Sequence, residues 1–260
     1  MTSISSQHNP RLKELRKLRR RRERDRSGLF LAEGEDLIAA AIAAGRPAVH
    51  GYRAVGSAIG GTDFDDVDPD VLLSVSALGS GTRAIGVYEQ RFTEPTGPLG
   101  IYLHGVADPG NVGTVLRGAL AFGASSVVLG PGCADPHSPK AVRASMGAIF
   151  HVALARASEL DELVGERCAL VAGAGDPLWR VAESIAAGEP HACERSPDGA
   201  GSGALTLLVG AEREGLPAEI VRACERVAHI PIAFESLNAA MAATVALYEM
   251  TRPSTRVPAS

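Results

Sequence analysis

The segment from Asp108 to Arg117, D-P-G-N-V-G-T-V-L-R, places an amide and a guanidinium where both can contact a ligand. An apolar run over 99–103 precedes it and an amphipathic pattern follows, which predicts a strand, a Gly/Pro turn and a helix. Open parallel sheets place ligands at such turns. Asn111 is expected to cap the helix, and Arg117 lies about 130° from the centre of the apolar stripe. A phosphate or nucleotide suits these groups, while a capped surface helix with a solvated arginine is the alternative.

A second polar segment covers 135–150 and reads D-P-H-S-P-K-A-V-R-A-S-M-G-A-I-F. Ser138 is placed to cap a helix whose first residue is Pro139. That helix carries Lys140 and Arg143, and the small residues after them permit close backbone contact. Simple helix packing is the alternative interpretation.

A third polar region lies near the C-terminal end. The stretch 207–217 reads L-L-V-G-A-E-R-E-G-L-P, a predicted strand that runs into a loop holding Glu212 between two glycines. After a short helix, the stretch 230–238 reads I-P-I-A-F-E-S-L-N and leads into a helix over 239–250. Ser236 and Asn238 stand at the N-terminus of that helix, where free N–H groups and the helix dipole favour a carboxylate or oxyanion. Simple capping is the alternative.

The elements that must position these residues form two domains. Six apolar runs alternate with helical patterns, which predicts a largely parallel α/β sheet: Leu99–His104, Ser126–Leu129, Ile149–Leu154, Cys168–Ala172, Leu205–Val209 and Val227–Ile230. Ahead of them, a basic helix capped by Ser6 or Asn9 and a helix over Gly34–Ala44 precede β-type runs at Ala48–Val55, Val71–Ser74 and Ile85–Phe92.

The sequence therefore predicts a small N-terminal α/β domain over 1–93, a linker over 93–98 and a larger domain over 99–260. The stretch from Gly188 to Gly203 is rich in Gly, Pro, Ser and Glu and is expected to be a surface loop.

Composition excludes several classes of protein. The chain has 260 residues, of which 45% are hydrophobic, and lacks both a signal-like apolar start and a run of the roughly 20 apolar residues that span a bilayer. A cytoplasmic protein without a membrane partner is expected. Its cysteines are irregularly spaced, which favours neither a metal site nor a disulfide framework: Cys133, Cys168, Cys193 and Cys224.

The charge is strongly asymmetric along the chain. Residues 1–26 hold ten Lys/Arg against three Asp/Glu, a balance of +7, and because the chain carries −4 overall the remainder carries −11. A basic arm on an acidic body is typical of a protein that binds a polyanion. Leu12, Leu15 and Leu18 give only a thin apolar seam without Trp or Phe, so RNA or DNA is favoured over a membrane surface, and a solvated helix is the alternative. The candidate RNA-binding residues are Arg16, Lys17, Arg19, Arg20, Arg21 and Arg22.

Together the three polar regions resemble the SpoU (SPOUT) family of RNA 2′-O-ribose methyltransferases. The resemblance covers nearly the whole chain, and its motifs occur in the family's order: D-P-G-N-V-G-T-V-L-R (108–117), K-A-V-R-A-S-M-G-A-I-F (140–150), G-A-E-R-E-G-L (210–216) and E-S-L-N (235–238). Two features depart from the family's pattern. Ala211 stands where the family often has Asn, and the spacing from Ile230 to Glu235 is shorter than usual.

The resemblance implies methyl transfer from S-adenosylmethionine to a ribose of RNA, a trefoil knot in the parallel-sheet domain, and a homodimer. The family's largely main-chain cofactor contacts fall near Val209, Gly210, Ile230, Pro231 and Leu237. Ribosomal RNA is favoured over tRNA, because the N-terminal domain resembles the substrate domain of rRNA-modifying members. A tRNA ribose methyltransferase and a non-catalytic RNA-binding factor that retains the fold are the alternatives. A nucleotide-dependent oxidoreductase is disfavoured because G-x-G-x-x-G is missing.

By position, the family's polar site residues fall on Asn111, Arg117, Glu212, Ser236 and Asn238. An arginine has been proposed as the base in this family, which here is Arg117. A guanidinium stays protonated in proteins, so Arg117 is alternatively a fixed cation that stabilises the developing alkoxide while phosphate or water takes the proton. Asn111 and Glu212 are expected to position it and the nucleotide, and Ser236 and Asn238 to shape the pocket.

Overall fold

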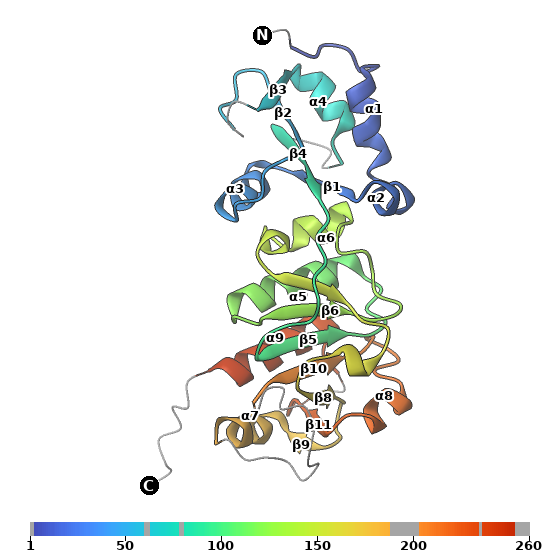
Figure 1. Cartoon of the computed structure of the whole chain (residues 1–260), viewed down its shortest axis with the longest axis vertical. Coiled ribbons are helices and arrows are strands. Elements are labelled where there is room, and N and C mark those ends of the chain that lie inside the picture. Colours follow the sequence, from blue (N-terminus) through green and yellow to red (C-terminus); the bar gives the residue numbers. More distant parts are fainter. Residues whose placement is uncertain (1–2, 60–62, 78–80, 188–202, 234–235, 253–260) are drawn as a thin grey trace. The chain divides into compact units, whose positions relative to one another are not determined.

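The chain divides into two units by the contacts among its residues. The computed structural model describes residues 3–59, 63–77, 81–187, 203–233 and 236–252 (Figure 1). Unit 1 comprises Met1–Arg91 together with Asp135–His151, and unit 2 comprises Phe92–Ala134 together with Val152–Ser260. The second polar segment of the sequence therefore packs with unit 1, although it lies far along the chain from the rest of that unit.

Unit 1 is built on a four-stranded sheet with the order β1-β4-β2-β3. The β1–β4 and β4–β2 pairs are antiparallel and the β2–β3 pair is parallel. Its elements are α1 (Pro10–Lys17), α2 (Arg21–Ser27), β1 (Leu29–Glu33), α3 (Glu35–Ala43), β2 (His50–Ala54), β3 (Phe64–Val67), α4 (Pro69–Val75), β4 (Ala84–Glu89), α6 (Pro139–Ala144) and the 3-10 turn η1 (Ala148–Phe150). A small N-terminal α/β fold is confirmed.

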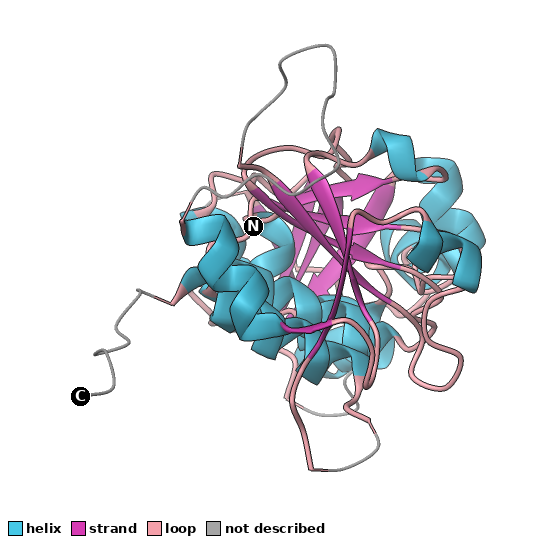
Figure 2. Ribbon diagram, turned by 90° about the horizontal axis from the view of Figure 1, so that it is seen from below, coloured by secondary structure: helices cyan, strands magenta, loops and turns pink. Residues whose placement is uncertain are grey.

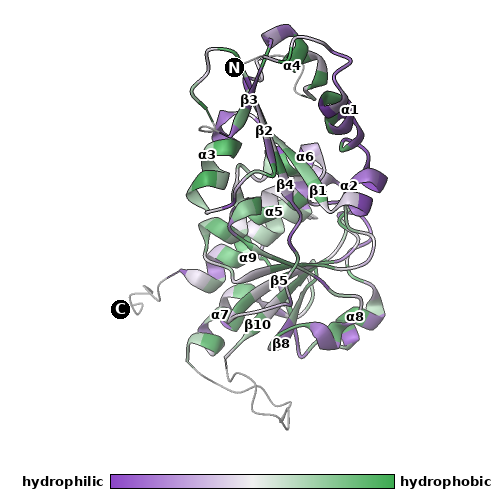
Figure 3. Ribbon diagram, turned by 45° about the horizontal axis from the view of Figure 1, so that its top comes forward, coloured by the Kyte–Doolittle hydropathy of each residue, from purple (hydrophilic) through white to green (hydrophobic). Residues whose placement is uncertain are grey.

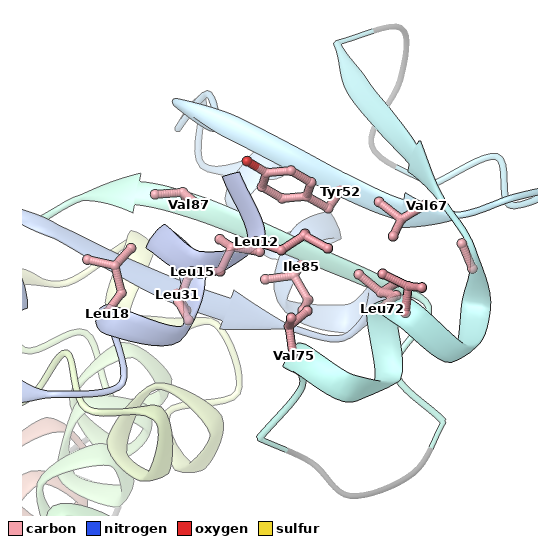
Figure 4. Close-up of a cluster of buried hydrophobic side chains, with 12 residues drawn as sticks. Leu12, Leu15, Leu18, Leu31, Tyr52, Val67, Leu72, Val75, Ile85 and Val87 are labelled. Carbon is pink, nitrogen blue, oxygen red and sulfur yellow. The ribbon is translucent and has the colours of Figure 1, made fainter. Parts of the chain in front are cut away.

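The apolar seam of the basic segment forms the inner face of α1. Asn9 caps this helix, since its Oδ1 accepts a hydrogen bond from the Arg11 N–H at 2.9 Å. Leu12, Leu15 and Leu18 are buried and point into a cluster with side chains from β2, β4 and α4 (Figure 4). A spacing of three residues thus keeps one face of α1 in the core and leaves its charges outside.

The sequence interpretation of unit 1 is wrong at Val71–Ser74, which was predicted as β-type. This stretch lies in helix α4, because Asp68 accepts hydrogen bonds from the N–H groups of Asp70 and Val71 and Pro69 occupies the first helical position. Strands β1 and β3 were not predicted. The expected helix over Gly34–Ala44 is confirmed as α3.

Unit 2 contains a seven-stranded sheet with the order β7-β6-β5-β10-β8-β11-β9, and every strand pairing in it is parallel. Its elements are β5 (Leu99–Leu103), α5 (Pro109–Ala121), β6 (Ser126–Leu129), β7 (Ala153–Arg156), the 3-10 turn η2 (Leu160–Glu162), β8 (Glu166–Leu170), β9 (Asp176–Pro177), α7 (Leu178–Ala186), β10 (Leu205–Val209), α8 (Ala218–Arg222), β11 (Arg226–His229) and α9 (Ala239–Thr251). The predicted parallel α/β class is confirmed.

The sheet of unit 2 is covered on both faces, as parallel sheets require. Helix α5 packs against α9, and α9 in turn contacts β10 and α7. The other face carries Tyr102, Val128 and Leu208, which pack against residues of η2 and α8. Helices and strands are distinguished in Figure 2. Strand β5 lies between β6 and β10. The next two strands along the chain, β6 and β7, lie on one side of β5, and β8 to β11 lie on its other side. This is a topological switch point, where ligands of open α/β sheets bind.

One strand prediction in this part of the chain is wrong. Ile149–Leu154 was expected to be a strand, but Ala148–Phe150 forms η1 and the strand β7 covers Ala153–Arg156. The apolar run was misleading because Phe150 serves the core of unit 1, where its ring meets that of Tyr88 with centroids 4.8 Å apart. Of the predicted surface loop Gly188–Gly203, residues 188–202 lie outside the described residues. No helix in the described ranges has the length and apolar character needed to cross a membrane.

Candidate active site

The turn after β5 begins helix α5 with Asp108, not with Asn111 as the sequence interpretation expected. Asp108 Oδ1 accepts a hydrogen bond from the Asn111 N–H at 3.0 Å, and Pro109 is the first helical residue. Asp108 therefore satisfies one of the free N–H groups of the helix. Because Asn111 lies within the first turn, its side-chain amide is not needed as a cap and turns to other partners.

The Asn111 amide joins the first polar segment to the third. Its Nδ2 donates a hydrogen bond to Glu212 Oε1, and its Oδ1 accepts one from Asn238 Nδ2 at 3.2 Å. Asn238 also caps α9, since its Oδ1 accepts hydrogen bonds from the N–H groups of Ala240 and Met241 at 2.9 and 3.3 Å. Three side chains from separate parts of the sequence thus form one hydrogen-bonded row, and this row fixes which end of the Asn111 amide faces which partner.

A tight turn after β10 presents Glu212. The Gly215 N–H donates to the Ala211 carbonyl at 2.9 Å and closes the turn. A Cβ at Gly210 would lie 2.2 Å from the carbonyl carbon of Gly215, so no other residue fits there. Glu212 is left exposed at the tip of this turn, within reach of Asn111.

Arg117 and Ser236 lie outside this row. Arg117 is exposed on α5, as the helical periodicity predicted, and no hydrogen bond or ion pair ties it to a described residue. Ser236 is exposed and lies two residues before Asn238, the N-cap of α9. It likewise makes no hydrogen bond within the described ranges. The structure therefore brings together Asn111, Glu212 and Asn238 and leaves Arg117 and Ser236 open to solvent.

A cavity of about 700 Å³ opens at the carboxyl ends of β8 and β11. Its lining consists of Ala172, Gly173, His229, Ile230, Pro231, Ile232 and Ala233. Ile230 and Pro231 were candidate cofactor residues, whereas Val209, Gly210 and Leu237 do not line this cavity. The volume lies within the range of small-molecule sites, and apolar walls suit a flat heteroaromatic ring. The size and the apolar lining of the cavity therefore fit the nucleoside part of a cofactor.

The sequence interpretation missed the loop after β8 and His229. Gly173 and Gly175 both adopt the left-handed conformation, with φ of +68° and +74°. A Cβ at Gly175 would lie 2.0 Å from the Val227 carbonyl oxygen, so glycine is required there. The Gly175 carbonyl accepts a hydrogen bond from His229 Nδ1 at 3.1 Å. The G-x-G spacing after an apolar strand was the signal that could have located this loop.

The six candidate RNA-binding residues have different surroundings. Arg16 donates to the Gln7 carbonyl and to Ser74 Oγ, and Arg19 donates to the Val75 carbonyl at 2.6 Å, so both hold α1 to its neighbours. Lys17 and Arg21 form surface ion pairs within their own helices, with Glu14 and Asp25 respectively. Arg20 and Arg22 are exposed, and no hydrogen bond or ion pair with a described residue holds either side chain. Most residues along α1 and α2 are hydrophilic (Figure 3).

One basic residue of the arm is structural. Arg24 is buried and donates through Nε and Nη2 to Asp135 Oδ2 at 2.9 and 2.5 Å. Its Nη1 donates to the carbonyls of Leu18 and Arg19 at 2.8 Å, which closes the turn between α1 and α2. Arg24 thus fixes the basic helices to the start of the segment Asp135–His151.

Burial keeps the Tyr102 hydroxyl on β5 and the thiols of Cys133 and Cys168 in their neutral forms. Burial raises the pKa of Tyr102 to about 12, and its hydroxyl lies 3.3 Å from His104 Nδ1. Burial also raises the pKa of Cys133 and brings that of Cys168 to about 12. These thiols are protonated near neutral pH and are poor nucleophiles. Within the described ranges, no three His, Cys, Asp or Glu side chains gather as metal ligands.

Two regions of the chain match models of known protein families. The model of the SpoU rRNA Methylase family matches residues 98–248, and that of the MRM3-like substrate binding domain matches residues 9–59. The 23S rRNA (guanosine(2553)-2′-O)-methyltransferase RlmP of Bacillus subtilis is 28% identical over 265 residues, covering 96% of this chain and 99% of that protein. The 23S rRNA (uridine(2479)-2′-O)-methyltransferase of Streptomyces viridochromogenes is 34% identical over 156 residues, covering 59% of this chain and 52% of that protein.

A solved structure has the same fold over nearly the whole chain. The AdoMet-bound rRNA methyltransferase from Sinorhizobium meliloti superposes with a TM-score of 0.77 at 28% identity, covering 96% of this chain and 97% of that one. The family model spans more than half of the chain, and its matched region contains all three segments that meet at Asn111. The chain therefore belongs to the SpoU rRNA methylase family.

Proposed function

We propose that this protein transfers a methyl group from S-adenosylmethionine to the 2′-hydroxyl of a ribose in ribosomal RNA. The observation that carries the proposal is the row Glu212–Asn111–Asn238, in which the family's polar residues meet at the switch point of the parallel sheet. The family membership and the two relatives named as 23S rRNA 2′-O-methyltransferases support the reaction and the class of RNA.

The cavity beside His229 is the proposed cofactor site. S-adenosylmethionine supplies an electrophilic methyl group when bound. The walls of Ile230, Pro231 and Ile232 would hold its nucleoside part, and the AdoMet-bound relative supports this cofactor. Gly210 would serve the site by allowing the tight turn that presents Glu212, because a Cβ there would meet the Gly215 carbonyl carbon.

The row of side chains would orient the ribose. Glu212 accepts from Asn111, and Asn111 accepts from Asn238, so the three groups hold one another in a single arrangement. Holding the hydroxyl in line with the methyl group removes much of the entropic barrier to transfer. Arg117 would act as a fixed cation beside the developing alkoxide, while phosphate or water takes the proton. Ser236 would contact the nucleotide at the N-terminus of α9.

Unit 1 would hold the RNA through its basic helices. Arg20 and Arg22 are free to contact phosphates, whereas Arg16 and Arg19 are engaged with the protein. The match to the MRM3-like substrate binding domain over residues 9–59 supports this role. Neutralising phosphates releases counterions, so the affinity for RNA should fall as salt rises.

A homodimer belongs to the same proposal. Helices α5 and α9 expose four large apolar side chains, namely Leu120, Met241, Val245 and Tyr248, which are 46%, 57%, 38% and 51% exposed. An apolar face on two adjacent helices is typical of a surface that another protein covers. Arg117 lies on α5, as Leu120 does, so a second copy of the chain on this face would border the catalytic site. The trefoil knot that the family resemblance implies and a cytoplasmic location stay predictions.

Methyl transfer to defined RNAs tests the proposal. Purified protein is incubated with S-adenosylmethionine labelled in its methyl group and with either unmodified ribosomal RNA or unmodified tRNA. Label in ribosomal RNA alone is the expected result. Label in tRNA alone would support the tRNA methyltransferase. Binding of ribosomal RNA without methyl transfer, and without heat of binding from S-adenosylmethionine, would favour the non-catalytic RNA-binding factor.

A further inference from the structure

Among the described residues that line the cavity at the ends of β8 and β11, one has a polar side chain, namely His229. The other six lining residues are apolar or glycine, and Ile232 is 40% exposed although it is large and apolar. A polar atom in apolar surroundings selects for the ligand group that satisfies it, because an unsatisfied partner costs binding free energy.

The hydrogen bond to Gly175 decides what His229 can offer. A backbone carbonyl only accepts, so Nδ1 carries the proton and donates to it at 3.1 Å. In the neutral imidazole the other nitrogen, Nε2, is then an acceptor. No described residue donates to Nε2. The required glycine at position 175 holds this carbonyl in place, since a Cβ there would meet the Val227 oxygen.

We propose that His229 Nε2 accepts a hydrogen bond from the exocyclic amino group of a purine, which makes His229 the residue that selects adenine in the cofactor. The proposal rests on the proposed function, in that it assigns this cavity to S-adenosylmethionine. The apolar side chains of Ile230, Pro231 and Ile232 suit the purine ring better than the charged methionine part, and the 6-amino group is the N–H donor that adenine offers to Nε2.

Two substitutions distinguish recognition of the purine by His229 Nε2 from the hydrogen bond that His229 Nδ1 donates to Gly175. In His229→Asn, the side-chain amide N–H can replace Nδ1 in the bond to Gly175, but no atom remains at the place of Nε2. In His229→Gln, the longer amide reaches the place of Nε2 with an acceptor oxygen. His50→Asn serves as a control, because His50 is an exposed histidine of unit 1.

Calorimetry on the full chain measures binding of two probes, S-adenosylhomocysteine and S-inosylhomocysteine, in which oxygen replaces the 6-amino group. The wild type is expected to prefer the adenine probe by about 2- to 10-fold, the effect of one net hydrogen bond. His229→Asn should lose this preference, while His229→Gln and His50→Asn should keep it. A wild-type preference retained in His229→Asn overturns the inference. Failure of the wild type to bind S-adenosylhomocysteine overturns the proposed function and the inference with it.

Discussion

Replacing Asn111 with alanine removes both of the side-chain hydrogen bonds that join it to Glu212 and Asn238. The bond to the Glu212 carboxylate is charge-assisted, of a kind that contributes about 1.5–3 kcal/mol, and the bond from Asn238 is of the neutral kind that contributes about 0.5–1.5 kcal/mol. Because Asn111 is half-buried and Glu212 and Asn238 are exposed, water replaces part of both. We therefore expect about 1.5–3 kcal/mol of lost transition-state stabilisation, a fall in kcat of about 10- to 100-fold.

The loss should appear in turnover and not in folding. Thermal unfolding should change by less than about 4 °C, since solvent satisfies the freed groups. Binding of S-adenosylmethionine should be preserved, because the cavity lining does not include Asn111. Methyl transfer to ribosomal RNA, calorimetry and thermal unfolding are measured side by side. Thr114→Ala is the matched control, since Thr114 lies on the same helix and, among the described residues, its hydroxyl bonds to the Gly110 carbonyl alone.

A double-mutant cycle then tests whether Asn111 and Glu212 act together. Once Glu212→Ala has removed the acceptor, Asn111→Ala should cost much less than it does alone, as happens when two residues act as a unit. Full additivity of the two losses, or near-wild-type turnover by Asn111→Ala, would refute the reasoning that this row positions the ribose.

Four further variants test other parts of the molecule. Arg117→Ala should abolish methyl transfer and leave cofactor binding intact, and full turnover by this variant would remove Arg117 from the mechanism. Replacing Arg20 and Arg22 together with alanine should reduce the slope of log K for RNA against log salt by about one for each phosphate that is no longer neutralised, and an unchanged slope would place the RNA elsewhere. Arg24→Ala should destabilise the fold by about 3–5 kcal/mol in chemical denaturation, because its carboxylate partner is left buried and unpaired; a loss below about 1 kcal/mol would contradict the burial of this pair. Tyr248→Glu should lower the mass in solution from dimer to monomer, and an unchanged mass would assign the apolar face of α5 and α9 another role.

The parallel sheet could be predicted because its strands are short apolar runs bounded by turn residues. Ser126–Leu129 and Leu205–Val209 have the predicted bounds, since buried strands in a parallel sheet are apolar on both faces. Val71–Ser74 misled because four residues of this kind fit a strand or a buried helix, and the deciding signal was the Asp-Pro pair before them. Ile149 and Phe150 were misassigned because periodicity does not tell which unit of the chain buries a residue.

The residues of the candidate site could be predicted from the sequence more reliably than the hydrogen bonds among them. The sequence placed Asn111, Glu212 and Asn238 at the ends of separate elements, but Asp108 and Asn111 are both good capping residues three positions apart. Only the backbone shows which of them caps α5. His229 was missed because a single histidine at the end of a strand has no periodic signature. Its importance comes from the Gly175 carbonyl, which a different loop supplies.

The basic arm shows the limit of charge counting. Ten Lys and Arg residues predict a polyanion-binding surface, yet Arg24 is buried in an ion pair and Arg16 and Arg19 hold α1 in place. A sequence does not distinguish a guanidinium that faces RNA from one that satisfies a carbonyl. The distinction requires the partners, and it leaves Arg20 and Arg22 as the residues to test first.

The position of the transferred methyl group tests the central claim most directly. Ribosomal RNA that the purified protein has methylated with labelled S-adenosylmethionine is hydrolysed in alkali, which cleaves RNA after every nucleotide that has a free 2′-hydroxyl. Methylation of a ribose 2′-oxygen predicts that all label is recovered in one alkali-resistant dinucleotide. Label recovered in mononucleotides would show methylation of a base and would contradict the account.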